Sequence, residues 1–118
     1  MPDPHYYYML GHSPETRLLA SLNGIPFFRT DDEPGGATRT SVADHLLVPG
    51  KNTFRLEIVE ALHWGGISFS LAWEHEHDDA TFECRWPDIL GETPLRDVKF
   101  PFIHHAEFEV EEPLRRPV

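Results

Sequence analysis

The segment GISFSLAWEHEH, residues 66–77, decides the fold class of this chain. Large apolar residues recur at every second position from Ile67 to Trp73, with small or polar residues between them. A period of two is the pattern of a β-strand that turns one face to a core and the other to solvent. The segment therefore predicts a strand, and the same parity continues outward to His75 and His77.

A second alternating segment, ATFECRW at residues 80–86, follows directly. The turn-prone pair at residues 78–79 predicts a tight hairpin between the two segments. Directly opposed residues of an antiparallel pair share a face, so a loop with an even number of residues matches apolar with apolar. This register is expected to place Trp73 opposite Cys84.

The rest of the chain is divided by 11 prolines and eight glycines into short pieces, most of which also alternate with a period of two. NTFRLEIVE, residues 52–60, is predicted to be a strand, because its apolar and polar residues largely separate by parity. PGKN before it is expected to form a turn. Asn23-Gly24 is a strong hairpin signal. Further strands are predicted at Tyr6–Leu10, Arg17–Leu22, Ile25–Arg29, Val98–Phe102 and Ala106–Glu111.

Two segments stand apart from this pattern. Residues 30–40, TDDEPGGATRT, are rich in acidic residues, glycine and threonine and are expected to form a mobile loop. SVADHLLV, residues 41–48, fits either one helical turn capped by Ser41 or a strand, and the sequence does not separate the two.

Seven to eight short strands without a convincing amphipathic helix predict an all-β fold, an antiparallel, jelly-roll-like β-sandwich. A length of 118 residues fits one domain. We expect residues 1–112 to form that domain and residues 113–118 to be a frayed tail.

The charge balance narrows the classes of partner. Twenty acidic and ten basic residues give a formal net charge of −10, which opposes binding to nucleic acid and to anionic membranes. A single cysteine cannot form an internal disulfide, and the first residues lack the pattern of a secretory leader, so a cytoplasmic location is expected. A protein partner or a neutral glycan fits this composition better than an anionic ligand.

One stretch of sequence resembles a known family. The turn residues of LNGIPFF and of D-x-x-L-x-x-G-x-N, residues 44–52, lead into the alternating strand at 52–60; they are Asn23, Gly24, Asp44, Leu47, Gly50 and Asn52. This arrangement resembles the jelly-roll, galactose-binding-like accessory domains of glycoside hydrolases. The resemblance covers about a third of the chain and implies a sandwich architecture. It transfers no catalytic residue, because the matching residues are turn formers.

The histidines allow a metal hypothesis. His75 and His77 are expected on one strand face, with their Cα atoms roughly 6.5 to 7 Å apart. His104 shares the parity of the apolar residues around it. Two histidines whose Cα atoms have this separation can turn their imidazole nitrogens toward one ion, and Zn²⁺ is the ion that fits them best. The alternative is that these residues are half-exposed histidines near the rim of the core, with no ligand.

No catalytic signature is present. There is no nucleophile elbow, phosphate loop or dinucleotide fingerprint, and Cys84 has the parity of an inert core thiol. Tyr7 and Trp64 are candidate exposed aromatic residues for a partner or glycan surface. We therefore expect a non-catalytic module that binds a protein partner through an acidic and aromatic surface, as an inhibitor, immunity-type or accessory protein. The alternatives are a metal-binding protein or metal-dependent enzyme, and a carbohydrate-binding module; exposed strand edges also allow a homodimer.

Overall fold

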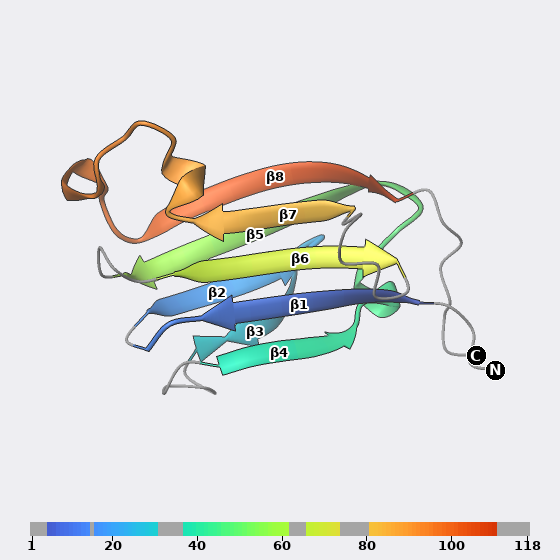
Figure 1. Ribbon diagram of the computed structural model, residues 1–118. Helices are drawn as coiled ribbons and strands as arrows, with labels where there is room; N and C mark the ends of the chain where they lie inside the picture. The colour runs from blue at the N-terminus through green and yellow to red at the C-terminus, as the bar shows by residue number, and fades with distance from the viewer. Residues whose placement is uncertain (1–4, 15, 31–36, 62–65, 74–80, 111–118) are drawn as a thin grey trace.

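The computed structural model describes residues 5–14, 16–30, 37–61, 66–73 and 81–110, which form eight antiparallel strands in two sheets (Figure 1). The first sheet has the order β4-β1-β6-β7 and the second the order β3-β2-β5-β8. The strands are β1 Tyr6–His12, β2 Arg17–Leu22, β3 Ile25–Arg29, β4 Ala37–Val42, β5 Gly50–Glu60, β6 Ile67–Trp73, β7 Phe82–Trp86 and β8 Phe102–Val110.

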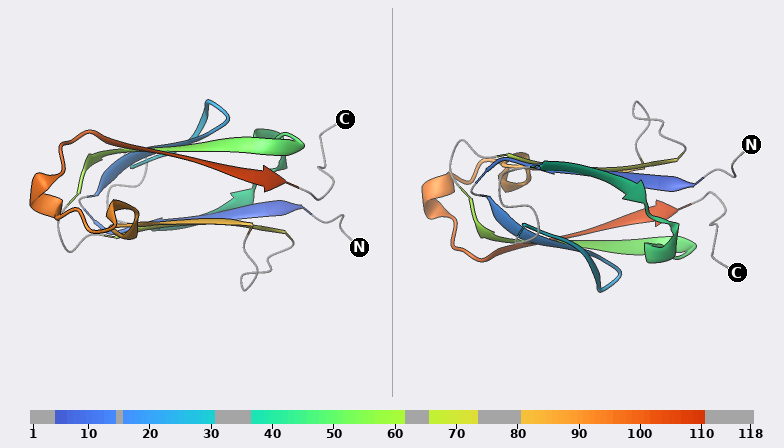
Figure 2. Two further views of the ribbon diagram at one scale, coloured as in Figure 1. Left: turned by 90° about the horizontal axis from the view of Figure 1, so that it is seen from above. Right: turned by 90° about the horizontal axis from the view of Figure 1, so that it is seen from below.

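The two sheets lie face to face as the layers of a sandwich (Figure 2). Five of the seven connections between successive strands pass from one sheet to the other; only β2–β3 and β6–β7 stay within a sheet. Short 3₁₀ turns lie at η2 Asp44–Leu46, η4 Asp88–Leu90 and η5 Leu95–Asp97. The prediction of an all-β antiparallel sandwich is confirmed. No helix in the described ranges is long and apolar enough to cross a bilayer.

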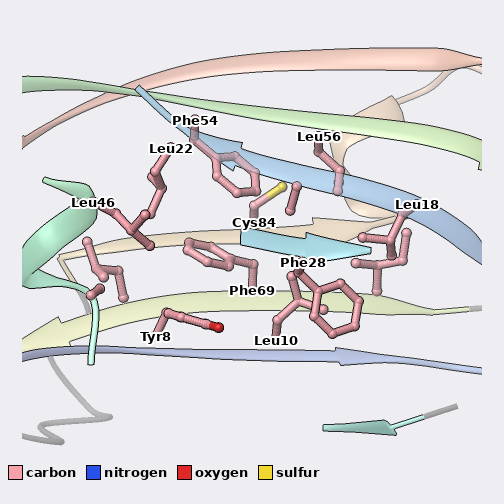
Figure 3. Close-up of a cluster of buried hydrophobic side chains, with 14 of the residues drawn as sticks. Tyr8, Leu10, Leu18, Leu22, Phe28, Leu46, Phe54, Leu56, Phe69 and Cys84 are labelled. Carbon is pink, nitrogen blue, oxygen red and sulfur yellow. The ribbon is translucent and has the colours of Figure 1, made fainter. Parts of the chain in front are cut away.

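The core is built around stacked aromatic rings (Figure 3). The rings of Phe54 from β5 and Phe69 from β6 stack with centroids 4.5 Å apart across the two sheets. Phe82 of β7 stacks in turn on Phe108 of β8, at 4.9 Å. These positions follow from the alternation, because each strand sends every second side chain between the sheets.

The hairpin of β6 and β7 keeps the predicted faces but not the predicted register. Trp73 and Cys84 both pack on the core side, as expected. The residue opposite Cys84 is Phe69, however, so the pairing is displaced by four residues along β6. A shift by an even number of residues leaves every side chain on its own face, and the alternation therefore could not distinguish the two registers. Residues 74–80, which hold the expected turn, lie outside the described residues.

The strand predicted at Val98–Phe102 was wrong, because β8 runs from Phe102 to Val110 and leaves Val98 to Pro101 outside it. The strand predicted at Ala106–Glu111 is present from Ala106 to Val110, as the second part of β8. Proline lacks an amide hydrogen for the ladder, so the strand begins after Pro101. Part of the expected loop at residues 30–40 is the strand β4. Its threonines favour extended backbone without supplying an apolar alternation.

Residues 41–48 combine both alternatives that the sequence left open. Ser41 and Val42 end β4, and η2 follows after Ala43, which precedes the turn without a side-chain cap. The turn predicted at 49–52 is wrong in its extent, because residue 49 is a bend and β5 already begins at Gly50. The φ of Gly50 is +85°, in the left-handed region that glycine favours. The expected tail lies among residues 111–118, outside the described ranges.

Two asparagines join the turns at one end of the sandwich. Asn52 is fully buried; its amide nitrogen donates to the Val48 and Gly50 carbonyls, and its oxygen accepts from the Val48 amide at 2.8 Å. Asn23 donates to the oxygen of Asn52 at 2.7 Å and to the Leu46 carbonyl at 2.9 Å. The turn residues that carried the family resemblance thus have a structural role here, because they satisfy buried polar groups.

Candidate binding surface

The outer face of the first sheet carries no charge across three adjacent strands. The side chains that β1, β4 and β6 turn away from the core are fixed by the observed pairing of the strands. We call these positions the neutral face: Tyr7, Met9, Gly11, Thr38, Thr40, Val42, Ser68, Ser70 and Ala72. Among the strand residues that the structure describes, charged side chains appear on this side of the sheet at β7, with exposed Glu83 and Arg85.

The outer face of the second sheet is charged. Lys51 of β5 and Glu107 of β8 form an exposed ion pair at 3.0 Å, which raises the pKa of the Lys51 amine. Arg55 and Glu57 pair at 3.4 Å within β5. The two outer faces therefore differ, although 30 of the residues of the chain are charged. A partner that covers the outer side of β1, β4 and β6 desolvates no charged side chain of these strands.

Tyr7 lies on the neutral face, where the alternation requires one ring of the three tyrosines to be. Tyr6 and Tyr8 point into the core, while Tyr7 is half-buried and contacts the ring of His5 edge-on at 6.3 Å. Its cross-strand neighbour Ala72 is only 4% exposed. The accessible part of the face therefore lies toward Met9 and Gly11. Trp64, the other aromatic candidate, lies outside the described residues.

The buried carboxylate of Asp44 anchors the start of β1 beside this face. Asp44 is 1% exposed and accepts a hydrogen bond from the Tyr6 amide at 2.8 Å. The Nδ1 atom of His5 lies 3.5 Å from the same carboxylate oxygen. The group binds the loop after β4 to β1, so its role is to position the strands.

The histidines of the zinc hypothesis are not brought together within the described residues. His104 lies on the inner side of β8 opposite Leu56, half-buried, while His75 and His77 lie outside the described ranges. Burial lowers the pKa of His104, and the neighbouring His105 lowers it further, which favours the neutral ring. No three His, Cys, Asp or Glu side chains in the described ranges form a group that could hold a metal ion. The zinc site stays a prediction.

Cys84 is an inert thiol of the core. It is 5% exposed, and burial raises its pKa to about 11 from an ordinary value of 9.0. At pH 8 the thiolate fraction is then about 100-fold smaller than in an exposed cysteine, and the thiolate is the nucleophile.

Thiol labelling tests this assignment. We expect Ellman's reagent at pH 8 to leave the native protein unlabelled over the time in which it titrates one thiol per chain in 6 M guanidinium chloride. The denatured sample is the control for the thiol's integrity. Labelling of the native protein at the rate of free cysteine would show that Cys84 is accessible and reactive.

Three shallow depressions lie away from the neutral face. One of about 320 Å³ is lined by residues of β2, β3 and β5, including Arg17, Arg29 and Glu57. Another of about 310 Å³ lies along β3, and a third of about 290 Å³ lies beside β7 at Cys84 and Asp88. The neutral face contributes no residue to these three depressions.

The uncharged face was missed at the level of sequence. In residues 6–12 and 66–73 the positions that alternate with the core residues carry no charge, so this part of the face can be seen in the sequence. The contribution of β4 depends on its pairing with β1, which the sequence did not predict.

Comparison with protein-family models, with curated proteins and with solved structures gives no match to this chain.

Proposed function

We propose that this chain is a non-catalytic binding module whose partner is another protein, bound at the neutral face. The observation that carries the proposal is the absence of charge on nine outward positions of β1, β4 and β6 in a chain of net charge −10. Charged residues are depleted at the centres of protein interfaces, where they would lose water without gaining a partner. The net negative charge of the chain would then steer the encounter and disfavour anionic partners.

The residue types on the neutral face favour a protein over a glycan. Sugar recognition relies on aromatic rings that stack on the pyranose, and Tyr7 is the one aromatic residue among the nine positions. Gly11, Ser68 and Ser70 are small, so the backbone of a packed partner can approach closely. A β-sheet of the partner could therefore pack on the neutral face at the ordinary distance between sheets, about 10 Å. A cytoplasmic location is part of this proposal and is supported by the single, buried cysteine.

A pair of matched arginine substitutions tests the proposal. Ser68→Arg places a charge on the exposed outer side of β6, and Thr53→Arg places the same charge on the exposed outer side of β5 in the second sheet. Tagged wild type and both variants are used to capture proteins from the native host, and the affinity for the purified candidate is then measured by calorimetry. We expect Thr53→Arg to bind like wild type and Ser68→Arg to bind at least about tenfold more weakly, since an unpaired interfacial charge costs several kcal/mol.

Two results would overturn the proposal. If both variants bound the captured protein with equal affinity, the interface would lie elsewhere. If tagged wild type captured no protein specifically, there would be no protein partner. Binding to a neutral glycan array that Ser68→Arg abolishes would assign the face to carbohydrate instead. Melting curves of the three proteins separate these outcomes from unfolding.

A further inference from the structure

β4 is an edge strand whose outer backbone groups point away from the sheet. Among the described strands it pairs with β1 alone. The Ala43 amide donates to the Tyr6 carbonyl at 2.8 Å, which sets the phase of the ladder: Ser41 and Arg39 are the residues hydrogen-bonded to β1. The amides and carbonyls of Thr38, Thr40 and Val42 therefore face outward along the edge. Figure 1 shows β4 at the margin of its sheet, beside β1.

The other three edges carry features that oppose pairing with another strand. β3 contains Pro26, which has no amide hydrogen, and a bulge interrupts its pairing with β2. β7 has five residues, with exposed Glu83 and Arg85. The outer positions of β8 include exposed Glu107 and Glu109, which would repel a second acidic chain.

β4 lacks all of these features. It has six residues, no proline and no acidic side chain, and its threonines and valine favour extended backbone. Its one charge is the positive charge of Arg39, whose side chain turns to the core side and lies 5.5 Å above the ring of Phe28. Two chains of net charge −10 repel each other, and β4 adds no negative charge to that repulsion.

We propose that β4 pairs antiparallel with β4 of a second copy of this chain, so that two first sheets join into one eight-stranded sheet. The residues whose backbone groups face outward fix the register, with Thr40 on the two-fold axis and Thr38 opposite Val42 of the second copy. Arg39 then lies opposite Ser41 of the second copy, and no two like charges are directly opposed. The inference rests on β4 and is independent of the partner proposed above.

The size of this contact predicts a reversible dimer. One pair of six-residue strands buries less than a standard protein interface, so the association depends on concentration. Salt screens the repulsion between the acidic chains, with a Debye length of about 10 Å at 0.1 M and about 3 Å at 1 M. Sedimentation velocity from 5 µM to 1 mM, in 20 mM and 500 mM NaCl, is expected to show the mass rise from 13.6 kDa toward twice that value, with a tighter dissociation constant at high salt.

Two substitutions at the axis and a matched control identify the edge. Thr40→Pro removes an outward amide hydrogen and leaves the ladder with β1 intact, and Thr40→Glu places two carboxylates against each other across the axis. His105→Pro is the control, because the phase of β5 and β8 turns the His105 amide outward on another edge. Both Thr40 variants are expected to raise the dissociation constant at least tenfold, and His105→Pro to leave it unchanged.

Three outcomes would overturn the inference. They are a monomer mass at 1 mM in 500 mM NaCl, a wild-type dissociation constant in Thr40→Glu, and an equal loss of the dimer in His105→Pro. If Thr40→Pro does not fold, its amide is bonded within the sheet and the assigned phase is wrong. The Ser68→Arg and Thr53→Arg variants report on the partner interface separately, so failure of one proposal leaves the other in place.

Discussion

Replacing Phe69 by alanine is expected to lower the free energy of unfolding by about 4 kcal/mol. Phe69 is 1% exposed and lies at the centre of the aromatic core (Figure 3). Its ring stacks on Phe54 at 4.5 Å and lies within 6.2 Å of the rings of Phe27, Phe82 and Tyr8. Because these neighbours come from both sheets, they cannot all close the space that the ring leaves, and the cavity adds to the lost burial. Urea denaturation with an unchanged m-value measures the loss.

Phe100→Ala is the matched control for this prediction. Phe100 is 38% exposed and makes one ring contact, with Trp86 at 6.1 Å. We expect its replacement to cost about 1 kcal/mol. If the two alanine variants were equally stable, the stack between the sheets would not be the centre of the core. Phe69→Leu, which retains much of the volume, provides a measurable intermediate if Phe69→Ala is unfolded in buffer.

Asn52→Asp is expected to cause the second large loss, and the loss should depend on pH. The amide nitrogen of Asn52 donates to the Val48 and Gly50 carbonyls at 2.8 and 3.0 Å. An aspartate places a carboxylate oxygen against those carbonyl oxygens in a fully buried site, which we expect to cost about 4 kcal/mol at pH 7. Asn52→Ala, which leaves the same groups unpaired without adding charge, should cost about 3 kcal/mol.

The sign of the pH dependence follows from linkage. Burial and the facing carbonyls raise the folded-state pKa of the introduced carboxyl above its unfolded value of about 3.9. The folded state then holds the proton more tightly, so the deficit of Asn52→Asp relative to wild type shrinks as the pH falls from 7 toward 4. Urea denaturation at both pH values, with exposed Thr38→Asp as the control, measures this difference. A deficit that stays constant with pH would mean that the carboxylate reaches solvent or that the network rearranges.

The alternation predicted the faces of the strands well because burial and strand geometry act on every residue of a pattern. It placed Trp73 and Cys84 on one side of the sheet and His104 toward the interior. It could not fix the register of β6 against β7, since a displacement of four residues leaves the same side chains buried. The pattern also missed β4, because an edge strand of threonines carries no apolar period.

The candidate surface depends on contacts that no local pattern contains. Tyr7, Thr40 and Ser70 come from three distant segments, and only the pairing of β1 with β4 and β6 brings them to one face. The absence of charge is visible at alternate positions of each segment, but its meaning requires the order of the strands. Trp64, His75 and His77 remain predictions of the sequence.

The order of the strands has a consequence for how the chain is built. β1 to β4 supply two neighbouring strands to each sheet, and β5 to β8 supply the other two, so the pairs β1–β6 and β2–β5 hold the two halves of the chain together. When only the first half of the chain has left the ribosome, β1 and β2 lack their partners β6 and β5, so both sheets have an unpaired edge. We therefore expect neither half to fold alone, and two separately expressed fragments divided between β4 and β5 to reconstitute the native sandwich when mixed.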